Sequence, residues 1–303
     1  MSRTIRFVAA SVVGLASLVI APAAATGLPV RTELSQDERA AGLWYAERMK
    51  FDQIQEQGLT GRGITIAVID DAINLDAPEL QGADIQVQGQ FCRNKETGNE
   101  PPAVSDELMR SHGTSAVSML VGNGVAGDGG LGTRGIVPEA KVLFYAVGAP
   151  EETFKEGEGD VCEGYNAVTG AFESDSQRDL KDPAEWPITN PTALAVRQAV
   201  EDGADVISIS IVESIFATDW ELAQIHALRA GVPIVAGSTN PTAMGTVEYL
   251  LPYSMNGVVA VGGVDKDGNV IRGYNLYGTE IVDARGSSNL AVAGPAMEML
   301  VPS

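Results

Sequence analysis

The chain has 303 residues, of which 45% are hydrophobic, and 40 acidic against 20 basic side chains give it a formal net charge of −20 at pH 7. An apolar fraction of this size is sufficient for a buried core. The acidic balance argues against nucleic-acid binding, because contact with phosphates requires basic side chains that displace counterions.

The first 25 residues have the pattern of a secretory signal peptide. Arg3 and Arg6 form a basic start, residues 7–20 are an apolar run, and Ala23–Ala25 offer a small-residue cleavage site. A transmembrane anchor is the alternative, but the apolar run is shorter than the roughly 18 residues that favour a membrane span. We therefore expect a secreted, extracellular or cell-envelope protein with no transmembrane segment after signal cleavage.

Apolar patterning predicts the elements that follow. Two stretches with apolar residues at helical spacing, from Asn190 to Gly203 and from about Asp219 to Ala230, predict amphipathic helices. Five β-branched runs predict strands that are buried on both faces: residues 64–69, 142–147, 206–211, 233–236 and 258–264. Strands separated by helices predict an α/β fold in three layers, with a mostly parallel central sheet and helices on both of its faces.

Two short motifs carry candidate functional residues. Asp70 ends the first predicted strand, at the carboxyl edge where parallel sheets form their sites. His112, in Ser-His-Gly-Thr, opens a helical stretch 42 residues later. Taken singly, Asp70 is also compatible with a strand-end cap and His112 with a helix N-terminal residue. A third candidate, Asn240 after the run 233–236, is also compatible with a loop residue beside Pro241. For His226, in the middle of a predicted helix, a structural role is favoured.

The sequence contains two cysteines and no clear metal motif. Cys92 and Cys162 lie in polar, loop-like stretches and can form a disulfide in an oxidising compartment, with two free thiols as the alternative. No transition-metal site is predicted, because His112 and His226 lack further His or Cys residues at ligand spacing. The sequence of residues 265–269 resembles a calcium-binding loop, but it favours a hairpin turn between apolar strands. No cofactor is expected, and calcium is the alternative.

Residues 149–187 interrupt the alternation of strands and helices. The segment contains eleven acidic and three basic residues, a net charge of −8. A solvated surface loop is the default interpretation of such a segment, and a functional loop is the alternative.

Several motifs occur in the same order as in the subtilisin-like serine peptidases, and the chain resembles that family from about Leu43 to the last residue. They are the approach to a catalytic aspartate (58–70), the segment after it (77–82), the catalytic-histidine motif (111–114), a turn and strand (135–141), a cleft-lining strand (204–210) and a run that ends in the oxyanion-hole asparagine (231–240). The resemblance implies a subtilisin-like fold and a serine endopeptidase that acts on peptide or protein substrates.

The resemblance also implies roles for individual residues. Asp70 would orient His112, and His112 would act as the general base that activates a serine hydroxyl. Asn240 would donate to the oxyanion of the tetrahedral intermediate. Three further residues would line the substrate cleft: Ser210, Ile211 and Val212.

The chain departs from the family at several of these positions. Asp71 and Ala72 stand where the family has a small hydroxyl residue and glycine, and Asp71 is expected to repel Asp70 or to point away from it. Val212-Glu213 replaces a glycine pair, and Thr239 replaces a glycine. These changes are expected to affect efficiency more than fold.

The nucleophile is the main absence. The one Gly-Thr-Ser run, 113–115, belongs to the histidine motif, and its Ser115 would share a helix with the base that it has to face. Ser287 and Ser288 lie in a polar loop and are weak candidates. Residues 290–295 resemble the last strand of the family before its serine motif. We therefore expect the chain to stop before the nucleophilic serine and its C-terminal helix region, and to be inactive alone.

The expected organisation is a signal peptide (1–25), a short leader (26–42) and an incomplete peptidase domain (43–303) that contains the acidic insertion 149–187. The leader is too short for a folded prodomain. The insertion is expected to favour basic peptides through its local potential.

Two other functions remain open: a catalytically inactive relative that binds peptides or proteins, and an exported structural or interaction module. The sequence makes no prediction about oligomeric state.

Overall fold

The computed structural model describes residues 34–94, 98–106, 112–148, 162–166, 171–172, 190–211, 218–237, 252, 255–269, 272–274, 280–282 and 290–295. The chain divides into two units, Met1–Leu34 and Ser35–Ser303, and almost all described residues belong to the second. The predicted signal peptide and most of the acidic insertion lie outside the described residues.

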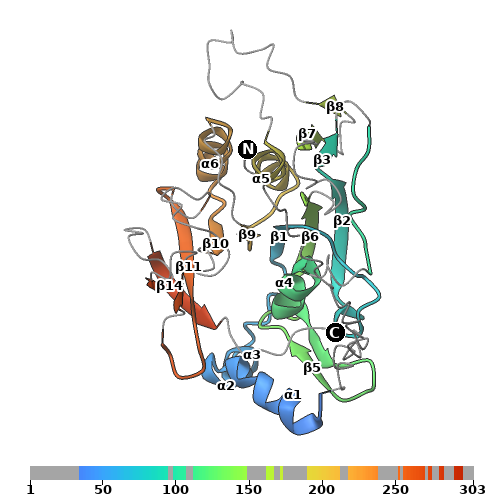
Figure 1. Cartoon of the computed structure of the whole chain (residues 1–303), viewed down its shortest axis with the longest axis vertical. Coiled ribbons are helices and arrows are strands. Elements are labelled where there is room, and N and C mark those ends of the chain that lie inside the picture. The colour runs from blue at the N-terminus through green and yellow to red at the C-terminus, as the bar shows by residue number, and fades with distance from the viewer. Residues whose placement is uncertain are drawn as a thin grey trace, which may run out of the picture. The chain divides into compact units, whose positions relative to one another are not determined.

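A parallel sheet of seven strands organises the second unit (Figure 1). Its order is β14–β11–β10–β9–β1–β6–β2, and every neighbouring pair is parallel. The strands are β1 (Thr65–Asp70), β2 (Asp84–Gln90), β6 (Lys141–Ala146), β9 (Val206–Ile209), β10 (Ile234–Gly237), β11 (Val258–Val264) and β14 (Leu290–Pro295). The predicted parallel sheet is confirmed, and β1 lies inside it between β9 and β6.

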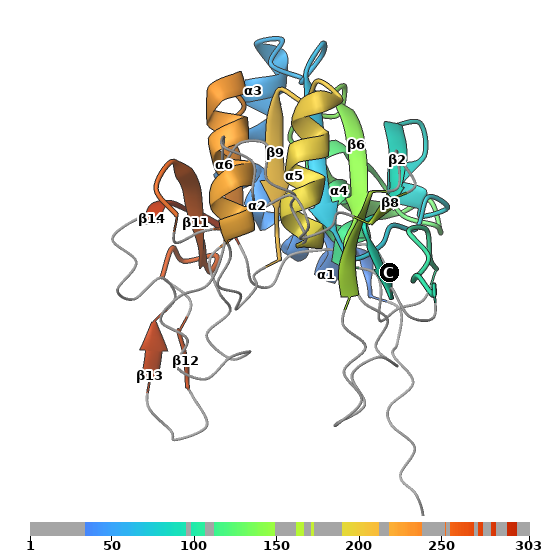
Figure 2. The same cartoon turned by 90° about the horizontal axis from the view of Figure 1, so that it is seen from above.

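Helices cover both faces of this sheet, as predicted (Figure 2). The described helices are α1 (Gln36–Gly42), α2 (Trp44–Arg48), α3 (Phe51–Glu56), α4 (His112–Val121), α5 (Pro191–Glu201), α6 (Thr218–Ala230) and the short η1 (Pro78–Leu80). The Asn190 side chain caps α5 by accepting a hydrogen bond from the backbone N–H of Ala193. Gly203 and Gly231, just after α5 and α6, have the positive φ that stops a helix at low cost.

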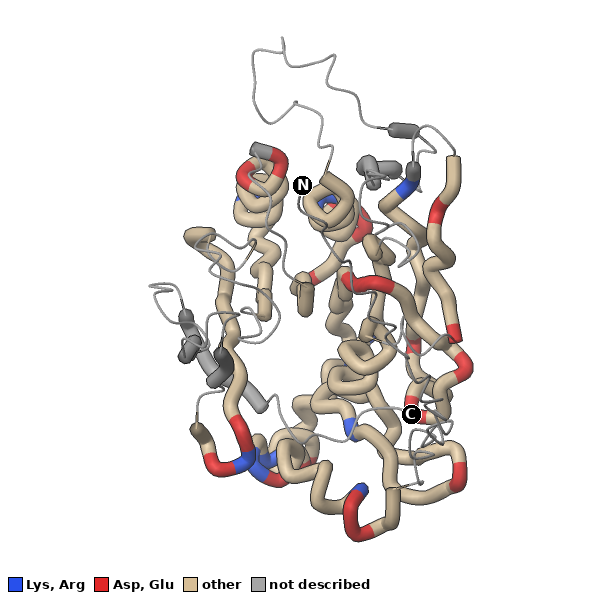
Figure 3. The backbone as a smooth tube through the Cα atoms, viewed as in Figure 1, with Lys and Arg blue, Asp and Glu red and all other residues tan. Residues whose placement is uncertain are grey.

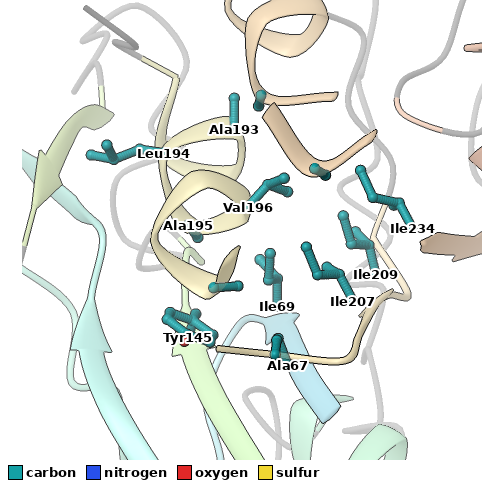
Figure 4. Packing of buried hydrophobic residues seen from close by; sticks show 14 of the residues in the cluster. Ala67, Ile69, Tyr145, Ala193, Leu194, Ala195, Val196, Ile207, Ile209 and Ile234 are labelled. Atoms are coloured by element: carbon teal, nitrogen blue, oxygen red, sulfur yellow. The ribbon is translucent and has the colours of Figure 1, made fainter. Parts of the chain in front are cut away.

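Alternate residues of β1 face different layers, which divides the core in two. Ala67 and Ile69 pack with α5 and α6 in one cluster (Figure 4). Ile66 and Val68 pack on the other side with Val117 of α4. These buried clusters hold the sheet between its helices, since burial of apolar side chains is the dominant favourable contribution to folding. They also fix the end of β1 relative to the start of α4.

Acidic and basic residues occur at many separate places along the described backbone (Figure 3). Ion pairs such as Arg62–Glu139 and Arg134–Asp52 involve exposed partners. Exposed pairs of this kind contribute about 0–1 kcal/mol each, so the apolar core rather than surface charge accounts for the fold.

The polar neighbours of Cys92 suggested a loop, but Cys92 lies in a strand. It is 2% exposed, begins strand β3 (Cys92–Asn94) and is disulfide-bonded. Strand β3 pairs antiparallel with β7 (Cys162–Asn166), which begins at the other cysteine of the sequence and also pairs with β8 (Ala171–Phe172). Strands β7 and β8 lie inside the segment 149–187 that was predicted as an acidic insertion, and β3 precedes that segment in the sequence.

The N-terminal part of the second unit is helical. Ser35 and Glu38 form a capping box at the start of α1. Gln36 accepts a hydrogen bond from the backbone N–H of Leu131, and Arg39 donates to the carbonyl of the same residue, in β5 (Leu131–Arg134). Residues 35–42, which were assigned to a leader, therefore contact the main domain through β5. Within the described residues, no helix combines the length and apolar character required to cross a membrane.

Two antiparallel pairs complete the described strands. Strand β4 (Asn123–Val125) pairs with β5, and β12 (Arg272–Tyr274) pairs with β13 (Glu280–Val282). Residues 265–269 form a tight turn in which Asp265 accepts hydrogen bonds from the backbone N–H groups of Asp267 and Asn269. The predicted turn is present, and among the described strands β12, which follows it, pairs with β13 and not with β11.

Candidate active site

Asp70 ends β1 in a fully buried position. Its side chain is 0% exposed, and its Oδ1 atom accepts a hydrogen bond from the backbone N–H of Asp71 at 2.8 Å. The same oxygen lies 2.7 Å from Nδ1 of His112. Among the described residues, Oδ2 has no hydrogen-bond partner. A buried carboxylate of this kind requires compensation, and His112 provides it.

His112 is the first residue of α4, and its imidazole extends from the helix toward the end of β1. The side chain is 55% exposed. Because the carboxylate can only accept, Nδ1 carries the proton in the hydrogen bond to Asp70. In the neutral ring the lone pair is then on Nε2, which faces away from Asp70. This tautomer is the one in which a histidine can remove a proton from a neighbouring hydroxyl.

The two groups influence each other's protonation. The hydrogen bond to Asp70 raises the pKa of His112 to about 9, against the opposing effect of partial burial. Burial raises the pKa of Asp70, and the hydrogen bond from His112 opposes that effect. The pairing with Asp70 therefore stabilises the imidazolium, and the neutral ring that can accept a proton becomes the main form as the pH rises through about 9.

Gly113 and Thr114, which follow His112 in its motif, allow α4 to pack against the loop after β1. A Cβ atom added to Gly113 would collide with the carbonyl oxygen of Ala72 and would lie 2.7 Å from Cζ of Phe144. Thr114 is buried, and its Oγ1 atom accepts a hydrogen bond from the backbone N–H of Asn74 at 2.8 Å. Glycine is needed for the close approach, and threonine fixes the loop to the helix.

Asp71 repels the charge of Asp70 weakly, as expected, and also forms contacts that were not expected. Its Oδ1 atom accepts hydrogen bonds from the backbone N–H groups of Ala72 and Gly113, the latter at 2.9 Å. Its charge does raise the pKa of Asp70, but as the smallest of the causes. The Asp71 carboxylate therefore acts mainly on the start of α4. The sequence alone did not indicate this role, because it depends on which segments meet in space.

Potential metal-ligand atoms of Asp70, Asp71 and His112 all lie within 4.8 Å of one another. The sequence prediction of no metal site considered only histidines and cysteines and did not find this group. In the structure, Nδ1 of His112 is paired with Asp70, and Oδ1 of Asp71 accepts from two backbone N–H groups. These atoms therefore take part in hydrogen bonds. The bond to Asp70 uses Nδ1 of His112 and not Nε2.

The remaining predicted residues follow β9, which is next to β1, and β10, which is next to β9. Ser210, which is exposed, and Ile211, which is half-buried, come directly after β9. Val212 and Asn240 lie outside the described residues, although β10, which ends at Gly237, is parallel to β9. Parallel register brings the carboxyl ends of β1, β9 and β10 to one edge of the sheet.

The candidate serines are not brought to His112 in the described part of the chain. Ser115 is the fourth residue of α4, the helix that His112 begins, and is half-buried. Ser287 and Ser288 lie outside the described residues. Of the described side chains, only Asp70 forms a hydrogen bond with His112.

Comparison with known proteins supports the resemblance. The chain is 27% identical over 187 residues to the minor extracellular protease Vpr of Bacillus subtilis (strain 168), which covers 60% of this chain and 18% of that protein. It is 33% identical over 100 residues to the Aeromonas extracellular serine protease of Aeromonas sobria, covering 33% of this chain and 13% of that protein. The chain thus spans less than a fifth of the length of these two curated relatives.

A solved structure shows the same fold. The crystal structure of Apa1, a psychrophilic subtilisin-like protease from Pseudoalteromonas sp. AS-11, has a TM-score of 0.51 at 17% identity, covering 83% of this chain and 45% of that one. The family model described as the subtilase family matches residues 61–299. With most of its length matched by that model, the chain belongs to the subtilase family.

Proposed function

We propose that this chain is part of a secreted serine endopeptidase in which Asp70 orients His112 and His112 serves as the general base. The observation that carries this proposal is the 2.7 Å contact between the buried Asp70 carboxylate and Nδ1 of His112. It is made at the carboxyl edge of a parallel sheet, where α/β proteins form their sites. Family membership supports the reaction class, and the contact supports the roles that we propose for Asp70 and His112.

The geometry fits the chemistry of peptide-bond hydrolysis. Nε2 of His112 would take the proton of a serine hydroxyl as that oxygen attacks the scissile carbonyl carbon, and would then deliver it to the leaving amine. Asp70 would hold the imidazole in the required tautomer and stabilise the imidazolium. Attack of water on the acyl-enzyme, again with His112 as base, would complete the cycle.

Neighbouring strand ends would bind the substrate. We assign the oxyanion donor to Asn240, three residues beyond the end of β10, on the basis of the sequence motif. Ser210, Ile211 and Val212 follow β9, the strand adjacent to β1, and would line the cleft for the peptide. Peptide or protein chains are the substrates that this arrangement suits.

The nucleophile would come from outside residues 1–303. Support for this comes from the sequence, where Gly-Thr-Ser occurs only at 113–115, and from the position of Ser115 on the same helix as the base. A polypeptide of these 303 residues alone would then be inactive.

Export is the second part of the proposal. It is supported by the signal-like residues 1–25, by the names of both curated relatives as extracellular proteases, and by the disulfide at Cys92. We pair Cys92 with Cys162, the only other cysteine of the sequence, across the β3–β7 ladder. Such a bridge is stable in an oxidising compartment.

Labelling with a serine-directed phosphonate tests the proposed function. The full-length gene product is expected to gain one phosphonyl group per chain, on a serine beyond residue 303, whereas a polypeptide of residues 1–303 gains none. The intact mass and the labelled peptide identify the site. A folded full-length product that stays unlabelled would favour a binding protein over a peptidase, and labelling within residues 1–303 would show that the assignment of the nucleophile is wrong.

A further inference from the structure

Asp71 contacts the backbone of the residue after His112 and is not itself part of the proposed triad. It follows Asp70 directly, and its half-buried side chain turns toward α4. Oδ1 accepts the backbone N–H of Gly113 at 2.9 Å, across 42 residues of sequence. The Asp71 backbone is packed closely, because a Cβ atom on Gly148 would lie 2.8 Å from its Cα.

A carboxylate suits this position for two physical reasons. The backbone N–H groups in the first turn of a helix have no partner within the helix, and the helix dipole makes that end positive. A hydrogen bond from N–H to an ionised acceptor is stronger than one to a neutral acceptor. Because Gly113 directly follows His112, holding its N–H fixes the backbone from which the imidazole extends.

The same carboxylate acts on the charge of the imidazole. Polar side-chain atoms of Asp70, Asp71 and His112 lie within 4.8 Å of one another, a distance at which a negative charge favours the imidazolium. Among the described residues, Asp70 and Asp71 are the charged groups that shift the pKa of His112, and both raise it. Asp70 does so mainly through its hydrogen bond, whereas Asp71 acts through charge alone.

We propose that Asp71 is a positioning residue for His112: it fixes the start of α4 through the N–H of Gly113 and supplies a second negative charge beside the imidazole. This inference rests on the proposed function for the role of His112 as base. The structural relation between Asp71 and His112 can be tested without any catalytic step.

Two substitutions separate the two contributions. Asp71→Asn keeps an oxygen acceptor but removes the charge, whereas Asp71→Ala removes both. In NMR titrations of the full-length gene product, both variants are expected to lower the titration midpoint of His112, by roughly half a pH unit. Hydrogen exchange of the Gly113 amide is expected to accelerate about tenfold in Asp71→Ala and by a smaller factor in Asp71→Asn, whose neutral oxygen is a weaker acceptor than the carboxylate. A His112→Gln variant assigns the resonance.

Asp76→Asn is the matched control, because it removes one negative charge from the same loop, where Asp76 is exposed. It is expected to change neither readout by a comparable amount. Unchanged midpoints in both Asp71 variants, or equal shifts in Asp76→Asn, would overturn the inference. That failure would leave phosphonate labelling unaffected, whereas a missing nucleophile would abolish labelling and leave these titrations as expected.

Discussion

Replacing Asp70 with asparagine is expected to lower kcat of the full-length gene product by roughly 10⁴-fold, the loss known for the equivalent change in a serine-protease triad. Asparagine is similar in shape to aspartate, but its amide cannot stabilise an imidazolium, and its NH₂ group can hold the ring in the wrong tautomer. His112→Ala is expected to cost more, about 10⁶-fold, as found for loss of the histidine in subtilisin. Initial rates on a chromogenic peptide measure both losses.

Asp205→Asn is a suitable control for the Asp70 variant. Asp205 also accepts a backbone N–H through its carboxylate, from Thr65 at 2.8 Å, but at the opposite end of β1. We expect this variant to keep kcat within a few-fold of the wild-type value. Similar losses in the two variants would mean that the carboxylates support the strand rather than the chemistry, and the assignment of Asp70 would fail.

Gly113→Ala is expected to destabilise the protein by roughly 2 kcal/mol or more. Overpacking of a tight interior costs about 1–3 kcal/mol, and occasionally more. Here the new methyl group meets the backbone carbonyl of Ala72, which cannot move away as a flexible side chain can. The usual gain of about 1 kcal/mol from alanine over glycine in a helix offsets part of this cost. Urea unfolding followed by circular dichroism measures the difference.

Gly237→Ala is the control for the Gly113 variant. Gly237 ends β10, and a Cβ atom there would meet its nearest atom, Cα of Ser210, at 3.9 Å, an ordinary contact distance. We expect stability within about 0.5 kcal/mol of the wild-type value. If Gly113→Ala were as stable as Gly237→Ala, the close approach of α4 to the loop after β1 would not be a constraint on the site.

The central sheet could be predicted because its strands are unbroken apolar runs. Strand β11 begins and ends as predicted, and β1, β6 and β10 are displaced by a single residue at most at each end. Strand β9 ends at Ile209, two residues early, because its ladder to β10 stops there. Strand β2 was missed, since glutamines alternate with its apolar residues and its register shifts between Val87 and Gly89.

The site could be predicted in part. The order of the motifs indicated that Asp70 and His112 would act together, and the structure brings them into contact. The contacts of Asp71 with Gly113 and of Thr114 with Asn74 were not predicted, since each joins segments about 40 residues apart. Periodicity and propensity describe single elements, whereas these hydrogen bonds depend on how β1 and α4 pack on their shared cluster.

The central claim, that Asp70 and His112 form a coupled pair, is tested most directly by NMR titration of His112 in the wild-type protein and in Asp70→Asn. Because the folded pKa lies above the ordinary value of 6.5, the stabilisation by the pair is complete below about pH 6.5 and is lost as the pH rises through about 9. We expect a midpoint of about 9 in the wild-type protein and a clearly lower one in Asp70→Asn. A wild-type midpoint near 6.5 that Asp70→Asn leaves unchanged would contradict the account.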